Sequence, residues 1–158
     1  MDVDEFWTLL ERLQPFERGR QLVRALAGLT GEEVIEFQQH VADAAQALNT
    51  SAHHAQPVAD TAGDDVPSAI PLGDDAFLSA RFAVVASGRQ VWAEVAADPS
   101  RFAGRWNLGL GYDIEIAIDT AFELVTGEPA PPSDIDEPPD QMLREKALPP
   151  LPRRSWLF

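Results

Sequence analysis

The sequence predicts an all-α protein, a small bundle of about five short helices with an extended, proline-rich C-terminal tail. Apolar residues recur at helical spacing through most of residues 1–127, as amphipathic helices require. A single segment alternates like a strand, and it has no second strand to pair with. Eight prolines fall within residues 128–158 and prevent regular structure over most of that stretch. We therefore expect one helical domain, residues 1–127, and a tail, residues 128–158.

The first three helices are expected at about residues 3–13, 16–28 and 30–48. Pro15 ends the first, because proline lacks the backbone donor that would continue it. Thr30 and Glu33 have the spacing of a capping box, in which each side chain accepts a hydrogen bond from the other residue's backbone amide. The third helix then carries one apolar stripe, formed by Val34, Phe37, Val41, Ala45 and Leu48.

A long loop is expected over residues 49–73, where prolines and glycines interrupt any periodic pattern. The fourth helix should begin at Asp74, which is a good N-cap, and break near Gly88. A fifth helix should run from there to Asp98. Connections of more than about 15 residues are usually functional or disordered, so the loop is notable for its length.

The remaining part of the domain is less regular. Arg101 to Trp106 is expected to form a short helical turn, and Gly109 to Gly111 a flexible joint. Residues 112–126 alternate like a strand at first, yet they also match an amphipathic helix that Gly127 would close. We favour a helix, because a lone strand has no partner.

Charge and composition exclude several classes of function. The net charge is −14, spread along the chain, and such a field repels phosphate backbones, so no nucleic-acid partner is expected. Cysteine is absent, which removes thiolate chemistry and cysteine-bound metals. The acidic start, Met1 to Glu5, is unlike a signal peptide, and no apolar run is long enough for a membrane span. We therefore expect a cytoplasmic protein without a membrane partner.

A candidate ligand site comprises Asp74, Asp75 and Arg81. Paired carboxylates can hold a divalent cation or transfer protons, although an N-cap and a dipole-compensating acid explain them equally well. Arg81 falls between apolar residues of the fourth helix, so we expect it to be buried and paired with a carboxylate. The alternative is a clamp for the carboxylate or phosphate of a ligand.

Two further clusters resemble metal sites only in part. Glu36, His40 and Asp43 share one face of the third helix, and His53-His54 lies in the loop beside several aspartates. The first set lacks a further ligand nearby in sequence. The adjacent histidines of the second set point in different directions. We expect neither a metal nor a cofactor.

Two surfaces are candidates for binding a partner. Glu115, Asp119 and Glu123 form an acidic ridge along the helix of residues 112–126, which is either solvated or faces a basic partner. The tail ends in basic and large apolar side chains that are unfavourable to leave in water: Arg153, Arg154, Trp156, Leu157 and Phe158. We expect this end to dock on its own bundle or on another copy, which would make a homo-oligomer.

The fourth helix and its neighbours resemble a known family. The residues concerned are Asp74-Asp75-x-Phe77, Arg81, Gly88, Trp92 and Asp98-Pro99, together with Phe6-Trp7. Their arrangement is similar to that of a bacterial domain-of-unknown-function family, number 4240, over roughly residues 1–48 and 73–127. Residues 49–72 lack the aromatic-rich stretch of that family. The resemblance implies a fold and a bacterial origin, and the family brings no established activity.

The sequence thus favours a non-catalytic acidic interaction module, that is, an accessory, regulatory or immunity-like protein that binds another protein. No glycine-rich phosphate loop, nucleophile elbow or HExxH motif occurs in the chain. The alternative is an enzyme or small-ligand binder with a polar pocket around Asp75 and Arg81.

Overall fold

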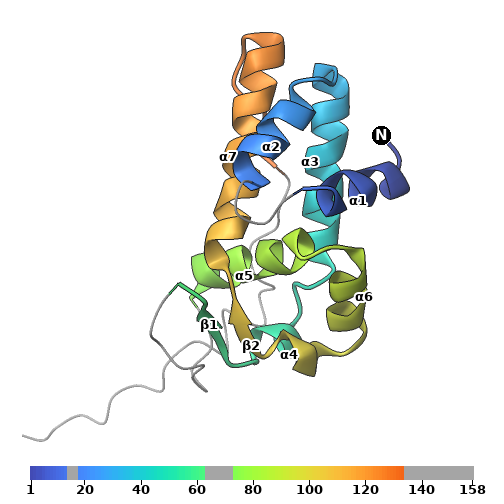
Figure 1. The fold of residues 1–158 in the computed structure, drawn as a ribbon. Helices are drawn as coiled ribbons and strands as arrows, with labels where there is room; N and C mark the ends of the chain where they lie inside the picture. The colour runs from blue at the N-terminus through green and yellow to red at the C-terminus, as the bar shows by residue number, and fades with distance from the viewer. Residues whose placement is uncertain (14–17, 63–72, 134–158) are drawn as a thin grey trace, which may run out of the picture.

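The computed structural model describes residues 1–13, 18–62 and 73–133, and these form a mostly helical fold (Figure 1). The prediction of a helical protein is confirmed. The tail residues singled out above, Arg153, Arg154, Trp156, Leu157 and Phe158, lie outside the described residues. Within the described ranges, no helix combines the length and the apolar character needed to cross a membrane.

Helices from both ends of the described chain form the upper part of the fold, as drawn in Figure 1. They are α1 (Val3–Glu11), α2 (Arg18–Leu26), α3 (Gly31–Gln46) and α7 (Leu108–Thr126). α3 and α7 are the longest, and α2 packs closely against α7. One hydrophobic core joins these helices to α5, and it is rich in aromatic side chains: the Phe6 ring lies 4.7 Å from Trp7 and 5.2 Å from Phe37.

The lower part is assembled from shorter elements. They are α4 (Ser51–His54), β1 (Val58–Asp60), α5 (Asp74–Ala86), α6 (Arg89–Ala97), the 3₁₀ helix η1 (Pro99–Phe102) and β2 (Gly104–Trp106). A second core lies here, built around Phe77, Val84 and Phe102. α5 belongs to both cores, so it ties the two parts together.

Two short strands replace segments that were expected to be loop and helical turn. β1 lies inside the predicted loop of residues 49–73, and β2 inside the predicted turn at Arg101 to Trp106. They form a parallel pair in which Val58 is opposite Gly104 and Asp60 opposite Trp106. Each has only three residues, too few for a period-two pattern, and the pairing joins distant parts of the chain. The described residues thus hold the predicted helices, a single-turn α4, the 3₁₀ helix η1 and this small sheet.

The sequence predicted three helix ends from their capping residues, and the structure confirms two of them. Thr30 caps α3 as predicted: its hydroxyl accepts from the amide of Glu33, whose carboxylate accepts from the amide of Thr30 at 2.8 Å. Gly127 closes α7 with a left-handed φ of 76°, also as predicted. The prediction that Asp74 caps α5 is wrong, because Gly73 occupies the N-cap and Asp74 lies in the first helical turn.

Gly109 and Gly111 are part of α7, so the predicted flexible joint is wrong as well. A Cβ atom at Gly111 would lie 2.6 Å from the Ser79 carbonyl oxygen and 2.9 Å from the Phe82 Cβ. Only glycine therefore allows α7 to approach α5 this closely. This approach sets the start of α7 against Phe82, beside the groove described next.

Candidate functional site

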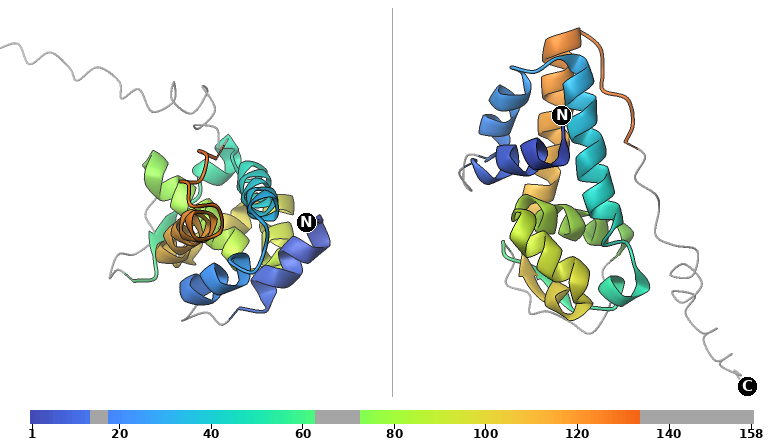
Figure 2. Two further views of the ribbon diagram at one scale, coloured as in Figure 1. Left: turned by 90° about the horizontal axis from the view of Figure 1, so that it is seen from above. Right: turned by 90° about the vertical axis from the view of Figure 1, so that its right-hand side faces the viewer.

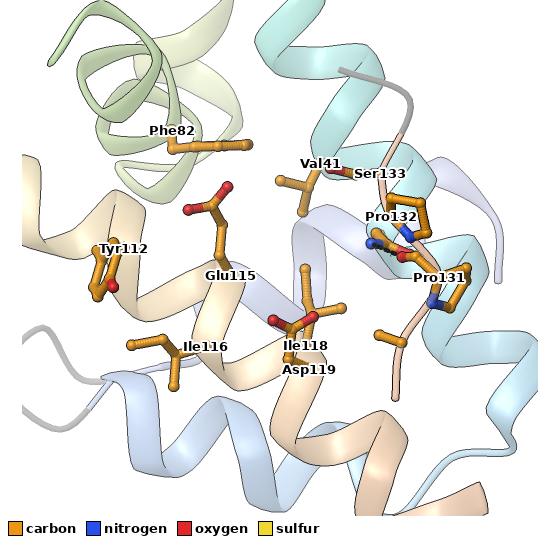
Figure 3. Close-up of a pocket in the computed structure, with 12 residues that line it drawn as sticks. Val41, Phe82, Tyr112, Glu115, Ile116, Ile118, Asp119, Pro131, Pro132 and Ser133 are labelled. Atoms are coloured by element: carbon orange, nitrogen blue, oxygen red, sulfur yellow. Dashed lines mark hydrogen bonds between the residues drawn. The ribbon is translucent and has the colours of Figure 1, made fainter. Parts of the chain in front are cut away.

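A groove of about 520 Å³ lies between α3, α5, α7 and the segment that follows α7 (Figure 3). Its lining includes Gln38 and Val41 of α3, Phe82 of α5 and a row of α7 residues. The α7 residues are Tyr112, Glu115, Ile116, Ile118 and Asp119, and the wall opposite them is Ala130, Pro131, Pro132 and Ser133. The volume is within the range of about 300–1,000 Å³ typical of ligand sites.

The wall exists because the chain reverses direction after α7. Gly127 adopts the left-handed conformation that ends the helix, and residues 128–133 then run back beside α3 (Figure 2). The side-chain amide of Gln38 donates a hydrogen bond to the Pro131 carbonyl at 3.1 Å, which holds this segment against α3. The start of the proline-rich tail is thereby part of the groove.

Two carboxylates, one helical turn apart, give the groove its charge. Glu115 is half-buried, and its carboxylate points toward Phe82 (Figure 3). Burial raises the pKa of Glu115, and the neighbouring charge of Asp119 raises this pKa further. No basic side chain among the described residues forms an ion pair with either of these two acids. The groove therefore favours a cationic group.

Exposed apolar side chains lie beside these acids. Tyr112 is 63% exposed and Ile116 is 48% exposed, and both line the groove. The two side chains lie one turn apart on the same face of α7, and an exposed apolar patch rimmed by polar groups marks a contact surface. The combination of an apolar floor and an acidic edge suits a ligand that has an apolar body and a positive end.

A second cavity, of about 590 Å³, lies between α1, α2 and the start of α3. Its acids are already engaged in local structure: Asp2 and Glu5 form the capping box of α1, and Glu33 belongs to that of α3. Asp4 pairs with Arg89 at 2.5 Å. This cavity therefore offers less unbalanced charge than the groove along α7.

Arg81 is buried as predicted, but its partner is different. Its side chain is 1% exposed, and Nη1 donates to the backbone carbonyl of Ala45 at 3.3 Å. The guanidinium also lies 4.9 Å from the centre of the Phe77 ring. No carboxylate of the described residues lies within ion-pair distance of the Arg81 guanidinium. The prediction that Arg81 pairs with an acidic side chain is therefore wrong.

The C-terminal end of α3 explains why a positive charge is buried there. The last turn of α3 contains no basic residue, and the carbonyls at this end of the helix carry partial negative charge. Arg81 contacts one of these carbonyls, and the Trp92 indole donates to another, that of Ala44, at 2.8 Å. Burial lowers the pKa of Arg81 to about 10, which still leaves the side chain charged at neutral pH. In the structure, its contacts are with the Ala45 carbonyl and the Phe77 ring.

Asp74 and Asp75 are exposed at the start of α5, whereas Arg81 is buried two turns later. Neither of the two cavities described above is lined by any of these three residues. The structure thus does not bring the predicted ligand-binding set together on one surface.

The histidines make hydrogen bonds or ring contacts within the fold. His53 is buried between the Thr50 hydroxyl, 2.7 Å from Nδ1, and the Val95 carbonyl, 3.0 Å from Nε2. His54 meets the Phe77 ring edge to face, and the Nε2 atom of His40 lies 3.1 Å from the Met1 carbonyl. In the part of the chain that the structure describes, no three acidic or histidine side chains gather as a metal site would require.

The residues on which the family resemblance rests have mainly architectural positions. Gly88 adopts a φ of 99°, which favours glycine, and Asp98 caps η1 by accepting from the Ser100 amide at 3.0 Å. Trp92 packs against Trp7, with ring centres 5.4 Å apart. Residues 1–123 match the family of proteins of unknown function designated DUF4240.

The chain belongs to the DUF4240 family. The match runs through residues 49–72, so the unusual composition of this stretch does not interrupt DUF4240 membership. No curated protein and no solved structure matches the chain significantly. A proposal for the function therefore has to be based on the geometry of the groove.

The sequence predicted part of this groove. It singled out Glu115 and Asp119, which line the groove, and Glu123, which is exposed one turn further along α7 and is not part of the lining. It missed Tyr112 and Ile116. The acids carry a further signal: residues 106–140 contain nine acidic residues and no Lys or Arg, so the charge of Glu115 and Asp119 has no compensation nearby in sequence.

Proposed function

We propose that this protein is an interaction module of accessory, regulatory or immunity-like type, which binds a basic segment of another protein in the groove along α7. The observation that supports the proposal is the pair Glu115 and Asp119, placed without a basic counterpart beside exposed apolar side chains. A catalytic or ligand site around Asp75 and Arg81 has less support, because these side chains do not converge.

The chemistry of recognition follows from the lining of the groove. An arginine or lysine of the partner would place its charge between the two carboxylates and its aliphatic stem on Ile116. The face of Tyr112 offers an additional cation–π contact to an arginine. The charge pairs would set specificity and association rate, and burial of the apolar surface would supply most of the affinity.

Selection from a random peptide library displayed on phage would test the proposal, with the full chain as bait. We expect the selected peptides to be enriched in arginine or lysine next to an aromatic residue. The double variant Glu115→Lys/Asp119→Lys removes two attractions and adds two repulsions, each worth about 0.2–1 kcal/mol. It should weaken peptide binding by about tenfold or more.

Glu123→Lys is the matched control, because it changes the charge of an exposed acid on the same helix outside the groove. This variant should bind the peptides nearly as well as the parent does. The proposal fails if no peptide is selected, if the peptides lack basic residues, or if the double variant and the control weaken binding equally. A small cationic molecule that competes for the groove would instead favour a ligand-binding protein.

A further inference from the structure

The chain itself supplies a segment whose chemistry matches the groove. Residues 141–158 contain four basic residues and one acidic residue, whereas the preceding residues 106–140 contain nine acidic residues and no Lys or Arg. We infer that residues 141–158 bind in the α7 groove of the same molecule, with their basic side chains toward Glu115 and Asp119.

The described part of the tail already leads into this groove. After the reversal at Gly127, residues 128–133 run back beside α3, and the hydrogen bond from Gln38 holds Pro131 there. Ser133, the last residue described, is itself part of the groove lining. The chain therefore continues from the groove and not from a distant point on the surface.

The length of the remaining segment permits the contact. Arg144 follows Ser133 by eleven residues, which can span at most about 36–40 Å when extended. α7 has 19 residues and is about 28 Å long. Any position along α7 is therefore within reach of the basic part of the tail.

The two surfaces also match in their apolar content. The segment carries Trp156, Leu157 and Phe158 beside Arg153 and Arg154. The groove presents Tyr112 and Ile116 beside its two acids. Covering both sets at once removes apolar area from water and pairs opposite charges in a partly desolvated place.

Binding within one molecule is favoured over binding between copies, because a short tether gives the segment an effective concentration in the millimolar range. If the groove also binds a partner, as proposed above, the tail is a built-in competitor that the partner must displace. This consequence rests on the proposed function, whereas the docking of the tail does not.

A paramagnetic label on the tail tests the docking directly. The chain has no cysteine, so Ser155→Cys creates a unique site for a nitroxide label in the full chain. The ¹⁵N-labelled, spin-labelled protein is diluted into an excess of unlabelled parent protein. We expect the amide signals of Tyr112, Ile116 and Asp119 to lose more than half of their intensity relative to the reduced label. Glu115→Lys/Asp119→Lys should restore these signals, and the control Glu123→Lys should not.

Three results would overturn the inference. The signals could keep their intensity, or the loss could persist in the charge-reversed double variant, in which case the groove is not the docking site. The loss of amide signal intensity could instead appear only in a mixture of two chains, one with the spin label and no ¹⁵N, the other with ¹⁵N and no spin label. That result would mean that the tail binds a second copy. Because no peptide derived from this chain is used in the library selection, either proposal can fail while the other holds.

Discussion

Gly111 offers a sensitive test of how α5 and α7 pack. Replacing it with alanine places a Cβ atom 2.6 Å from the Ser79 carbonyl oxygen, where ordinary contact begins at 3.4 Å. The two helices would have to separate by about 0.8 Å, or their side chains would have to leave preferred rotamers. Overpacking of this kind costs about 1–3 kcal/mol.

Gly109 is the matched control within the same helix. A Cβ atom there would meet only the Asn107 side chain, at 3.2 Å, and Gly109 is exposed. Both substitutions gain the helix propensity of alanine, worth about 0.5–1 kcal/mol. The difference in the free energy of unfolding between Gly111→Ala and Gly109→Ala therefore isolates the steric cost of a Cβ atom where α7 contacts α5.

Urea and thermal unfolding, followed by circular dichroism, measure this difference. We expect Gly109→Ala to be as stable as the parent or slightly more stable. Gly111→Ala should be less stable than Gly109→Ala by about 1–3 kcal/mol, a fall in melting temperature of about 2–4 °C for each kcal/mol. If Gly111→Ala is as stable as Gly109→Ala, the close approach of α7 to α5 is not a constraint and the reasoning is refuted.

Three other predictions follow from the structure. Arg81→Ala should lose about 2–5 kcal/mol because it empties a buried site, whereas Arg81→Met should stay within about 1.5 kcal/mol of the parent in urea unfolding. A large loss in both variants would point to a carboxylate paired with Arg81. Burial raises the pKa of Glu115 in the folded state, so its ionisation destabilises the fold as the pH rises above the ordinary value of 4.5. Glu115→Gln should therefore have a higher melting temperature than the parent at pH 7 and an equal one well below pH 4.5; an unchanged difference across this range would contradict the burial. Thr30→Ala should lose about 1 kcal/mol through loss of the α3 cap, and a parent-like denaturation midpoint would show that the capping box contributes nothing.

Local signals were sufficient to predict the longer helices. The apolar stripe and the capping box of Thr30 and Glu33 placed α3 almost at its observed bounds. α7 was predicted as a helix in spite of its alternating start, and it begins four residues earlier than predicted, at Leu108. These signals work because helical hydrogen bonds and side-chain periodicity both depend on residues close in sequence.

The strand pair and the surroundings of Arg81 could not be predicted in this way. Three-residue strands carry almost no pattern, and their pairing joins Val58 to Gly104 across much of the chain. The burial of Arg81 followed from its apolar neighbours in sequence. Its partner did not, because the carbonyl end of α3 meets α5 only in the folded protein.

By itself, the sequence determined that the protein is helical, that its charge is strongly negative and that the helix of residues 112–126 has an acidic ridge. Only the tertiary structure decided which of these acids line the same groove. The reversal at Gly127 and the Gln38–Pro131 hydrogen bond place a wall opposite Glu115 and Asp119, whereas Glu123 stays outside. The physical reason is that acidity is a property of individual residues, but desolvation depends on which distant segments cover them.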